Sequence, residues 1–289
     1  MKSVDILVAV RNEERSIPLF INKFNELALD NVKVNIIFLE DGSSDGTVPL
    51  LRDLSKKFDN VDYISLDNKH GQYAALSLGL SLSKADAVIT MDVDGGHPVE
   101  TAIEMIKSYI KGHNLVQGQR IIYKRKKFYR SIMSYAYNLF FYLIVGVNLF
   151  KQNVMFRLMD RSTTEKFLEN RNWWHIFKTN FNVKDEIKVS YIRYAAPERE
   201  FGESKYGLFR LLKLSYKSFF SLLPIKRLVI INISLIGLLI LFGYYGFILF
   251  SIFSLIAILV IDISYYSIVN HYPIPSIKII ETSMPELKR

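Results

Sequence analysis

The chain has 289 residues, 50% of them hydrophobic, and its mean hydropathy of +0.15 is too high for an ordinary soluble protein of two small domains. Part of the chain is therefore expected to lie in a membrane. A formal net charge of +9 suits either nucleic acid or an anionic membrane surface as the partner. The absence of cysteine excludes disulfides, thiolate catalysis and cysteine-ligated zinc, and is compatible with a reducing cytoplasmic setting.

Residues 1–115 alternate short apolar runs with helical patterns. The opening MKSVDILVAVRNEER lacks the apolar core of a signal peptide, so we expect this part to stay on the side of the membrane where it is made. The sequence predicts strands in DILVAV, VNIIFLE, VDYISL and DAVITMDV, and helices in IPLFINKFNELAL, TVPLLRDLSKKF and AALSLGLSLSK. This alternation predicts parallel βαβ units in a doubly wound α/β sheet.

A polar cluster follows each of the four predicted strands. In chain order the clusters are RNEE at 11–14, EDGSSDGT at 40–47, NKHG at 68–71 and DVDGGH at 92–97. Doubly wound sheets bind their ligands beyond the carboxyl ends of the strands. The coincidence of all four clusters with strand ends therefore predicts one composite site.

The second cluster contains two adjacent acids. Helix capping explains Ser44 and Asp45, which precede a predicted helix. It does not explain Glu40 and Asp41, because neighbouring like charges repel unless a ligand donor or a cation is present. We therefore expect Asp41 to accept hydrogen bonds from a base or a ribose.

The third cluster ends at Gly71, just before a predicted helix. The free N–H groups of such a helix favour a phosphate nearby. Lys69 and His70 could add positive charge, and a solvated loop is the alternative for each of them.

The fourth cluster holds Asp92 and Asp94, two carboxylates one residue apart at a strand end. Such carboxylates can reach one Mg²⁺ or Mn²⁺, which takes further oxygens from a bound diphosphate and water. An isolated pair of this kind is common by chance. Here it follows a predicted buried strand, in phase with three other clusters, and this context predicts a metal and diphosphate site.

Residues 228–269 contain no Lys, Arg, His or Glu and a single acid, Asp262. Because a membrane-spanning helix needs about 20 apolar residues, this run predicts two such helices joined near 243–246. Basic residues flank the run on both sides, which puts both of its ends in the cytoplasm. One long or broken helix is the alternative. Asp262 lies either at membrane depth, where an acid is often functional, or close enough to the interface to be hydrated.

Several motifs together resemble the GT-A domain of family 2 glycosyltransferases: VAVRNEERSI, FLEDGSSDGT, NKHGQYAALSLGL and MDVDGGHPVE, in this order and spacing. The resemblance continues through FRLMDR at 156–161 and REFGESKYG at 199–207 into the paired apolar helices, so it covers nearly the whole chain. This arrangement is similar to the polyprenyl-phosphate glycosyltransferases, relatives of dolichol-phosphate mannose synthase. It implies inverting transfer of a sugar from a UDP- or GDP-sugar to a polyprenyl phosphate, for envelope glycan or glycolipid modification.

The resemblance also implies a role for individual residues in a metal-dependent hexosyltransferase that uses Mg²⁺ or Mn²⁺. The implied catalytic residues are Asp92, Asp94, Arg199 and Lys205. The implied substrate-binding residues are Ala9, Arg11, Glu13, Glu40, Asp41, Lys69, Gly71, Arg120 and Ser204. The implied metal ligands are Asp92 and Asp94, with His97 as a candidate third.

The chain departs from the family pattern at three places. The family often has Pro and Tyr where this chain has Ala9 and Arg11, so Arg11 is a candidate phosphate contact in place of a stacking ring. Glu40 stands where the family usually has the first of two aspartates. The residue two after the second metal-binding aspartate is often a glutamine that can bind the metal, and here it is Gly96.

Residues 120–152 begin with basic residues and continue with about 20 mostly apolar ones, a length that could span a membrane. A third span would put the later motifs on the wrong side, so we expect an interfacial helix. Residues 205–227 carry Arg210, Lys213 and Lys217 at near-helical spacing and predict a second surface helix. Basic residues gathered beside the membrane, without a known recognition module, disfavour nucleic acid.

We therefore predict a GT-A domain, Rossmann-like with a mostly parallel sheet, followed by membrane elements. The predicted boundaries are 1–204 for this domain with a membrane-facing helix in 120–152, 205–227 for an amphipathic helix, 228–269 for a transmembrane hairpin and 270–289 for a cytoplasmic tail. The predicted location is the cell (inner) membrane, multi-pass, with the catalytic domain on the cytoplasmic side. The predicted partners are the nucleotide sugar, the polyprenyl phosphate lipid and the membrane, and the resemblance allows a homo-oligomer.

Two other classes of protein share parts of this pattern. A processive polysaccharide synthase would need more spans and usually carries Gln-x-x-Arg-Trp, which NRNWWH at 170–175 does not match. A non-catalytic membrane protein that binds nucleotide is the other alternative, and Gly96 is the feature that favours it.

Overall fold

The computed structural model describes residues 1–25, 31–121, 128–145, 155–168, 187–195, 216, 219–220, 223–245, 247–270 and 277–287. The chain forms two compact units. The first comprises Met1–Lys126, Lys151–Glu203 and Ile274–Arg289, and the second comprises Lys127–Phe150 and Ser204–Pro273. Three predicted site residues, Arg199, Ser204 and Lys205, lie outside the described residues.

The first unit is built on an eight-stranded mixed sheet with the order β7-β5-β6-β4-β1-β2-β3-β8. The strands are β1 (Lys2–Val10), β2 (Val32–Glu40), β3 (Val61–Leu66), β4 (Ala87–Met91), β5 (Leu115–Ile121), β6 (Arg157–Asp160), β7 (Val189–Ala195) and β8 (Ile279–Thr282). Strand β1 is parallel to β2 and β4, β2 is parallel to β3, and β5 is parallel to β7. The predicted mostly parallel sheet is therefore confirmed.

Two antiparallel strands complete this sheet, and the sequence did not indicate either of them. Strand β6 lies between β4 and β5 and is antiparallel to both. Strand β8 is antiparallel to β3 at the edge of the sheet. Because β8 falls within 270–289, the segment predicted as a tail contributes a strand to the first unit, followed by the short 3₁₀-helix η2 (Pro285–Leu287).

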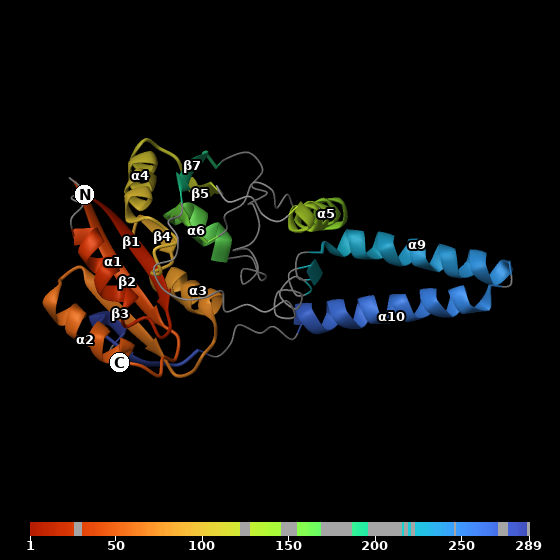
Figure 1. Ribbon diagram of the computed structural model, residues 1–289, viewed down its shortest axis with the longest axis horizontal. Helices are drawn as coiled ribbons and strands as arrows, with labels where there is room; N and C mark the ends of the chain where they lie inside the picture. Colours follow the sequence, from red (N-terminus) through yellow and green to blue (C-terminus); the bar gives the residue numbers. More distant parts are fainter. Residues whose placement is uncertain are drawn as a thin grey trace. The chain divides into compact units, whose positions relative to one another are not determined.

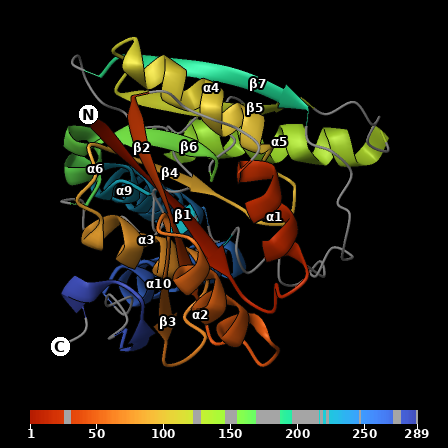
Figure 2. The same cartoon turned by 90° about the vertical axis from the view of Figure 1, so that its left-hand side faces the viewer.

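Helices cover both faces of the sheet (Figure 2), because alternate side chains of each central strand point to opposite sides. Val4, Ile6 and Val8 of β1 pack in one cluster, with helices α1 (Ser16–Asn25), α2 (Thr47–Lys57) and α4 (Val99–Ile110). Leu7 packs in the other cluster, with α3 (Gln72–Leu82) and α6 (Arg161–Leu168). With both faces buried, residues 6–10 of β1 and residues 87–89 of β4 are continuous apolar runs, as is usual for buried parallel strands.

The register of the parallel strands places their carboxyl ends next to each other at one end of the sheet. Val10 at the end of β1 pairs with Glu40 at the end of β2, and Glu40 pairs with Ser65 of β3. On the other side of β1, Val8 pairs with Met91, the last residue of β4. The four polar clusters therefore emerge side by side, as predicted.

The second unit contains α5 (Phe128–Val145) and two long apolar helices, α9 (Ile225–Tyr244) and α10 (Ile248–Asn270). Helices α9 and α10 lie side by side (Figure 1); α9 ends at Tyr244 and α10 begins at Ile248. Among the described residues, two stretches are long and apolar enough to cross a membrane: Ile225–Tyr244 and Ile248–Ser267, with mean hydropathies of 2.2 and 2.4. The apolar part of α5, Tyr135–Val145, is shorter.

Asp262 of α10 has a partner on the neighbouring helix that the sequence analysis did not identify. The side-chain amide of Asn232 on α9 donates a hydrogen bond of 2.7 Å to Asp262 Oδ1. A second polar contact joins the same two helices, where Ser251 Oγ donates to the carbonyl oxygen of Leu239 at 3.3 Å. Asp262 therefore forms an interhelical contact inside the hairpin.

Candidate functional site

The loops after β1 and β2 are joined by Asn12. Its backbone N–H donates to Ser43 Oγ at 3.0 Å, and its side-chain oxygen accepts the N–H of Ser44 at 2.8 Å. Asn12 has a φ of 57°, a left-handed conformation that asparagine tolerates better than most residues. Arg11 beside it is exposed and donates from Nε to the carbonyl oxygen of Gly42 at 3.3 Å. Sequence reasoning selected Arg11 and missed Asn12, although an asparagine two residues after a strand is a recognisable turn signal.

The loops after β2 and β3 approach each other at Gly42. This glycine has a φ of +67°, and a Cβ there would lie 2.9 Å from the backbone nitrogen of Lys69 and 3.0 Å from the carbonyl carbon of Asn68. Both neighbours are backbone atoms that cannot simply rotate away. The close contact of the two loops therefore requires glycine at this position.

Asp41 binds the loop after β3 with both of its carboxylate oxygens. Oδ1 accepts the N–H of His70 at 2.6 Å and the N–H of Gly71 at 3.0 Å, and Oδ2 accepts the same Gly71 N–H at 2.9 Å. Burial raises the pKa of Asp41 above its ordinary value of 3.8, and the N–H bonds from His70 and Gly71 oppose part of that rise. The loop is closed on its other side by His70 Nε2, which lies 2.7 Å from Asp67 Oδ1.

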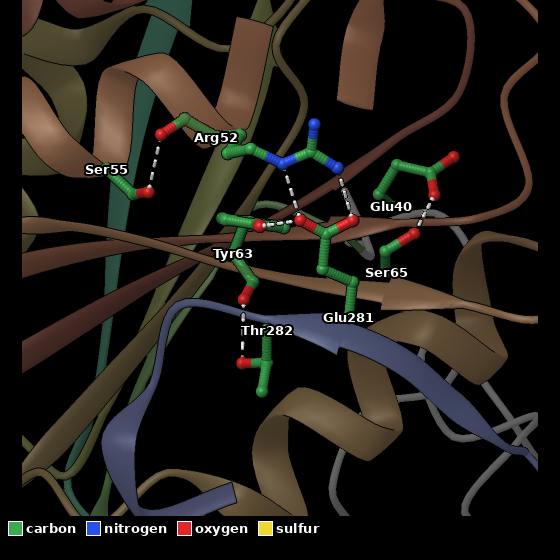
Figure 3. A network of polar contacts seen from close by, with 7 residues as sticks. All are labelled: Glu40, Arg52, Ser55, Tyr63, Ser65, Glu281 and Thr282. Atoms are coloured by element: carbon green, nitrogen blue, oxygen red, sulfur yellow. Dashed lines mark hydrogen bonds and ion pairs between the residues drawn. The ribbon is translucent and has the colours of Figure 1, made fainter. Parts of the chain in front are cut away.

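Glu40 is almost completely buried, at 1% exposure. Its carboxylate accepts the backbone N–H of Ser43 and, at 2.6 Å, the hydroxyl of Ser65 on β3 (Figure 3). The two adjacent acids thus obtain their donors from the protein itself. This corrects the sequence argument that Glu40 and Asp41 need a ligand donor or a cation to lie next to each other.

Glu13 lies three residues before the first residue of helix α1. Its carbonyl oxygen accepts the N–H groups of Ser16 and Ile17 at 3.0 and 3.1 Å, and its Oε2 accepts the hydroxyl of Ser16 at 2.7 Å. Its own N–H donates to Thr47 Oγ1 at 3.0 Å, which ties the start of α1 to the start of α2. The neighbouring Glu14, which sequence reasoning did not select, accepts the N–H of Gly46 at 2.8 Å.

The loop after β4 is joined to the third loop by Gln72, the first residue of α3. The side-chain amide of Gln72 donates a hydrogen bond to Asp92 Oδ1. With this contact, hydrogen bonds connect all four loops in sequence order. Sequence reasoning did not select Gln72, although it directly follows the NKHG cluster.

Asp94 is held by the glycine that replaces the glutamine of the family pattern. Its Oδ1 accepts the N–H of Gly96 at 3.0 Å, and a Cβ at position 96 would lie 2.9 Å from the same oxygen. Asp92 and Asp94 are both half-buried. Among the described residues, no group of three or more His, Cys, Asp or Glu side chains is arranged to hold a metal ion. Two carboxylates suit a hard cation that obtains its remaining oxygens from a diphosphate and water.

His97 accepts a hydrogen bond from the backbone of Asp92. Its Nδ1 accepts the backbone N–H of Asp92 at 2.8 Å, so Nδ1 carries no proton and its 3.7 Å separation from Asp92 Oδ2 is not an ion pair. The ring stacks on Phe156 with a centroid distance of 4.6 Å and meets Tyr194 edge-on at 6.1 Å. Nδ1 is therefore already used, and a metal-ligand role for His97 would fall to Nε2.

The remaining predicted residues lie at the periphery of these loops. Ala9 is half-buried in β1, and Lys69 is exposed in the third loop. Arg120 lies within β5, where it is exposed and paired in register with Tyr194. A pocket of about 290 Å³ adjoins Asp94, with walls that include Leu19, Phe20, Val93 and Pro98. The space beside Asp94 is large enough for a sugar-sized group.

The sequence model of the family Glycosyl transferase family 2 matches residues 5–181. The chain belongs to this family. The match covers all four site loops and runs from within β1 through β6, so the family predicted from the motifs is confirmed.

This family 2 glycosyltransferase is 29% identical over 223 residues to the undecaprenyl-phosphate 4-deoxy-4-formamido-L-arabinose transferase of Aeromonas hydrophila, covering 75% of this chain and 66% of that protein. It is 26% identical over 220 residues to the transferase of the same name from Photorhabdus laumondii, with the same 75% and 66% coverage. The chain thus spans slightly less than two thirds of the length of these relatives.

The fold is similar to that of glucosyl-3-phosphoglycerate synthase from Mycobacterium tuberculosis, solved in complex with Mn²⁺, UDP and glucosyl-3-phosphoglycerate. The TM-score is 0.52 at 16% sequence identity, over 78% of this chain and 80% of that one. At this identity the similarity concerns the fold. It confirms the GT-A architecture predicted for the first unit.

Proposed function

We propose that this family 2 glycosyltransferase transfers a sugar from a UDP- or GDP-sugar to a polyprenyl phosphate. The observation that carries the proposal is that one chain combines the Asp92 and Asp94 loop, joined to three other strand-end loops, with two helices able to cross a membrane. A soluble nucleotide donor suits the first feature and a lipid acceptor suits the second. The similarity to undecaprenyl-phosphate transferases supports the same acceptor.

On this proposal the four loops bind the donor. Asp41 and Glu13 contact the nucleoside, where the closed third loop leaves Asp41 fixed. Arg11 and Lys69 would contact the phosphates, and Gly71 would lie beside them, with its own N–H bound by Asp41. Glu40 contributes by holding the loop that begins with Asp41. The pocket beside Asp94 is the proposed space for the sugar.

Asp92 and Asp94 would hold a Mg²⁺ or Mn²⁺ ion together with the donor diphosphate. When bound, such an ion neutralises the charge that develops on the departing diphosphate. Asp92 is oriented for this role by Gln72, and Asp94 by the N–H of Gly96. A glycine at position 96 offers no side-chain oxygen, so water and diphosphate oxygens would have to supply the ligands that Asp92 and Asp94 do not.

The acceptor needs little help from a general base, because a phosphate monoester is anionic at neutral pH. One of its oxygens forms a bond to the anomeric carbon while the bond from that carbon to the diphosphate breaks, and the nucleoside diphosphate leaves. A single in-line displacement inverts the anomeric centre. We assign binding of the acceptor and donor phosphates to Arg120, Arg199, Ser204 and Lys205, since guanidinium and ammonium groups suit phosphate oxygens.

We further propose that α9 and α10 cross the cell membrane as a hairpin with both ends in the cytoplasm. The basic residues Lys226 and Arg227 at the start of α9 support this orientation. Helix α5 and residues 205–227 would lie at the interface, and residues 1–204 apart from α5, completed by β8, would form the cytoplasmic catalytic domain. A homo-oligomer through the membrane region is part of the same proposal.

The test is donor turnover by the purified full-length protein in lipid nanodiscs with polyprenyl phosphate and Mg²⁺ or Mn²⁺. A panel of UDP- and GDP-sugars is supplied, and the glycolipid is detected by mass spectrometry. The proposal predicts one or few productive donors. If UDP or GDP binds but none of the panel yields a glycolipid, the non-catalytic alternative replaces the enzyme.

A further inference from the structure

The last described strand, β8, is the edge strand next to β3. It pairs antiparallel with β3, with Ile64 opposite Thr282 and Ser65 opposite Glu281. The pairing is reinforced by side chains, because the hydroxyl of Thr282 donates to the carbonyl oxygen of Tyr63 at 2.9 Å. Met284, just beyond the strand, is buried in the core on the α3 face. The segment 277–287 is thus an integral edge of the sheet.

Glu281 is the strongest polar anchor of this segment. Its two carboxylate oxygens accept from Nε and Nη2 of Arg52 on α2, each at 2.7 Å, in a two-point contact (Figure 3). One of them also accepts the hydroxyl of Tyr63 at 2.5 Å. Glu281 therefore fixes β8 both to the helix above β3 and to β3 itself.

Two series of contacts connect β8 with the site loops. In the first, the carbonyl oxygen of Lys278 accepts the N–H of Asp67 at 3.0 Å, at the start of the third loop. Asp67 then contacts the ring of His70, and the backbone N–H of His70 donates to Asp41. In the second, Ser65 lies between Glu281 and Glu40 in the sheet, and its hydroxyl binds Glu40 at 2.6 Å.

We propose that Glu281, by anchoring β8 to Arg52, is a positioning residue for the donor nucleotide and holds the Asp67–Gly71 loop in the conformation that orients Asp41. This inference rests on the proposed function of the four loops as a nucleotide site. The physical reason is preorganisation: a loop already fixed by Lys278 and Asp41 loses less conformational freedom when the nucleotide binds. Loosening β8 would therefore weaken donor binding without removing any group that contacts the reacting atoms.

The experiment compares wild type with Glu281→Ala in the full-length protein in nanodiscs. UDP and GDP binding is measured by calorimetry with Mn²⁺ and without acceptor, and KM for donor, KM for acceptor and kcat are measured with the productive sugar. The expected result is a nucleotide Kd and donor KM raised about tenfold, with kcat and acceptor KM changed less than about twofold. The charge-exchanged double variant Arg52→Glu with Glu281→Arg should recover much of the nucleotide affinity.

A matched control comes from the same segment. Lys84 Nζ lies 3.0 Å from Glu286 Oε2, and these side chains are 78% and 49% exposed. This ion pair also ties the segment to the rest of the first unit, but at the opposite end of the strands from the four loops, next to Ser3 and Asp5. Lys84→Ala is expected to leave the nucleotide Kd unchanged, and the thermal midpoint of each variant reports its folding.

Three results would overturn the inference. The first is an unchanged nucleotide Kd in folded Glu281→Ala. The second is an equal loss of affinity in Lys84→Ala, which would show a general structural effect. The third is a fall in kcat alone, with donor KM intact. Failure of the proposed function has a different signature: wild-type protein then binds neither UDP nor GDP, or yields no glycolipid, whatever stands at position 281.

Discussion

The backbone N–H of Asp92 donates to Nδ1 of His97 at 2.8 Å, and the same ring stacks on Phe156. An aspartate of the acid pair is thus held by a histidine five residues later in its own loop. This contact assigns Nδ1 of His97 a supporting role, because a nitrogen that accepts a hydrogen bond from the backbone cannot at the same time bind a metal, and it leaves Nε2 as the nitrogen to be tested.

Substitution of His97 distinguishes the two roles of its ring. Asparagine places an acceptor near the position of Nδ1, whereas glutamine places its amide near Nε2. We expect His97→Gln to weaken Mn²⁺ binding in the presence of UDP or GDP about tenfold, the equivalent of one lost hydrogen bond of about 1.4 kcal/mol. His97→Asn should retain more of the affinity. The reverse order in a calorimetric Mn²⁺ titration would instead indicate that Nε2 is a metal ligand.

Gly96→Ala tests how Asp94 is positioned. The added Cβ would lie 2.9 Å from Asp94 Oδ1, which is the far end of a side chain that can rotate. We therefore expect Asp94 to turn away from the Gly96 N–H, with several-fold weaker Mn²⁺ binding and an unchanged thermal midpoint. Gly237→Ala is the control, since a Cβ there meets no atom within 4 Å. A large drop in thermal midpoint with intact Mn²⁺ binding would contradict this account of Gly96.

Gly42→Ala should have the opposite signature, with a clear loss of stability. The substitution puts an alanine at a φ of +67° and a Cβ 2.9 Å from the backbone nitrogen of Lys69. A left-handed alanine costs about 1–2 kcal/mol before the clash is counted. Gly46→Ala in the same loop is the matched control, because its Cβ would meet only the movable carboxylate of Glu14. Equal thermal midpoints for the two variants would show that the loops do not require Gly42.

The ion pair of Glu281 and Arg52 predicts a pH dependence of stability. The guanidinium of Arg52 and the hydroxyl of Tyr63 lower the pKa of Glu281 from 4.5 to about 2. A lowered folded-state pKa contributes stability that is present above pH 4.5 and is lost as the pH falls toward 2. The difference in thermal midpoint between wild type and Glu281→Gln should therefore be constant near neutral pH and shrink below pH 4.5. A difference that persists at the lowest pH would show that the charge of Glu281 is not what stabilises β8.

The alternating part of the fold could be predicted from the sequence. Strands β1 to β4 are buried on both faces, so each appears as an apolar run followed by a polar cluster, and their parallel arrangement brings the clusters together. The antiparallel strands β6 and β8 could not be predicted in the same way. Each has only four residues, and its place in the sheet depends on neighbours far away in the chain, as Glu281 depends on Arg52 and Tyr63.

The site could be predicted at the level of loops but not of contacts. The clusters correctly predicted that Asp41, Asp92 and Asp94 lie at the same end of the parallel strands. The donors that stabilise Asp41 come from His70 and Gly71, about 30 positions later, and backbone N–H groups leave no trace in a sequence pattern. The connecting residues Asn12 and Gln72 were missed for a different reason: their side chains contact Ser44 and Asp92 in neighbouring loops, and a sequence pattern does not reveal these partners.

The central claim is that the loop of Asp92 and Asp94 catalyses sugar transfer to a lipid phosphate. The most direct measurement is glycolipid formation from the productive nucleotide sugar and polyprenyl phosphate by wild type and Asp94→Asn in nanodiscs, with UDP or GDP binding recorded in parallel. The account predicts turnover by wild type that depends on Mg²⁺ or Mn²⁺ and falls at least about 100-fold in Asp94→Asn, a loss of about 2.7 kcal/mol of transition-state stabilisation. Full activity of Asp94→Asn, or turnover indifferent to a chelator, would contradict it.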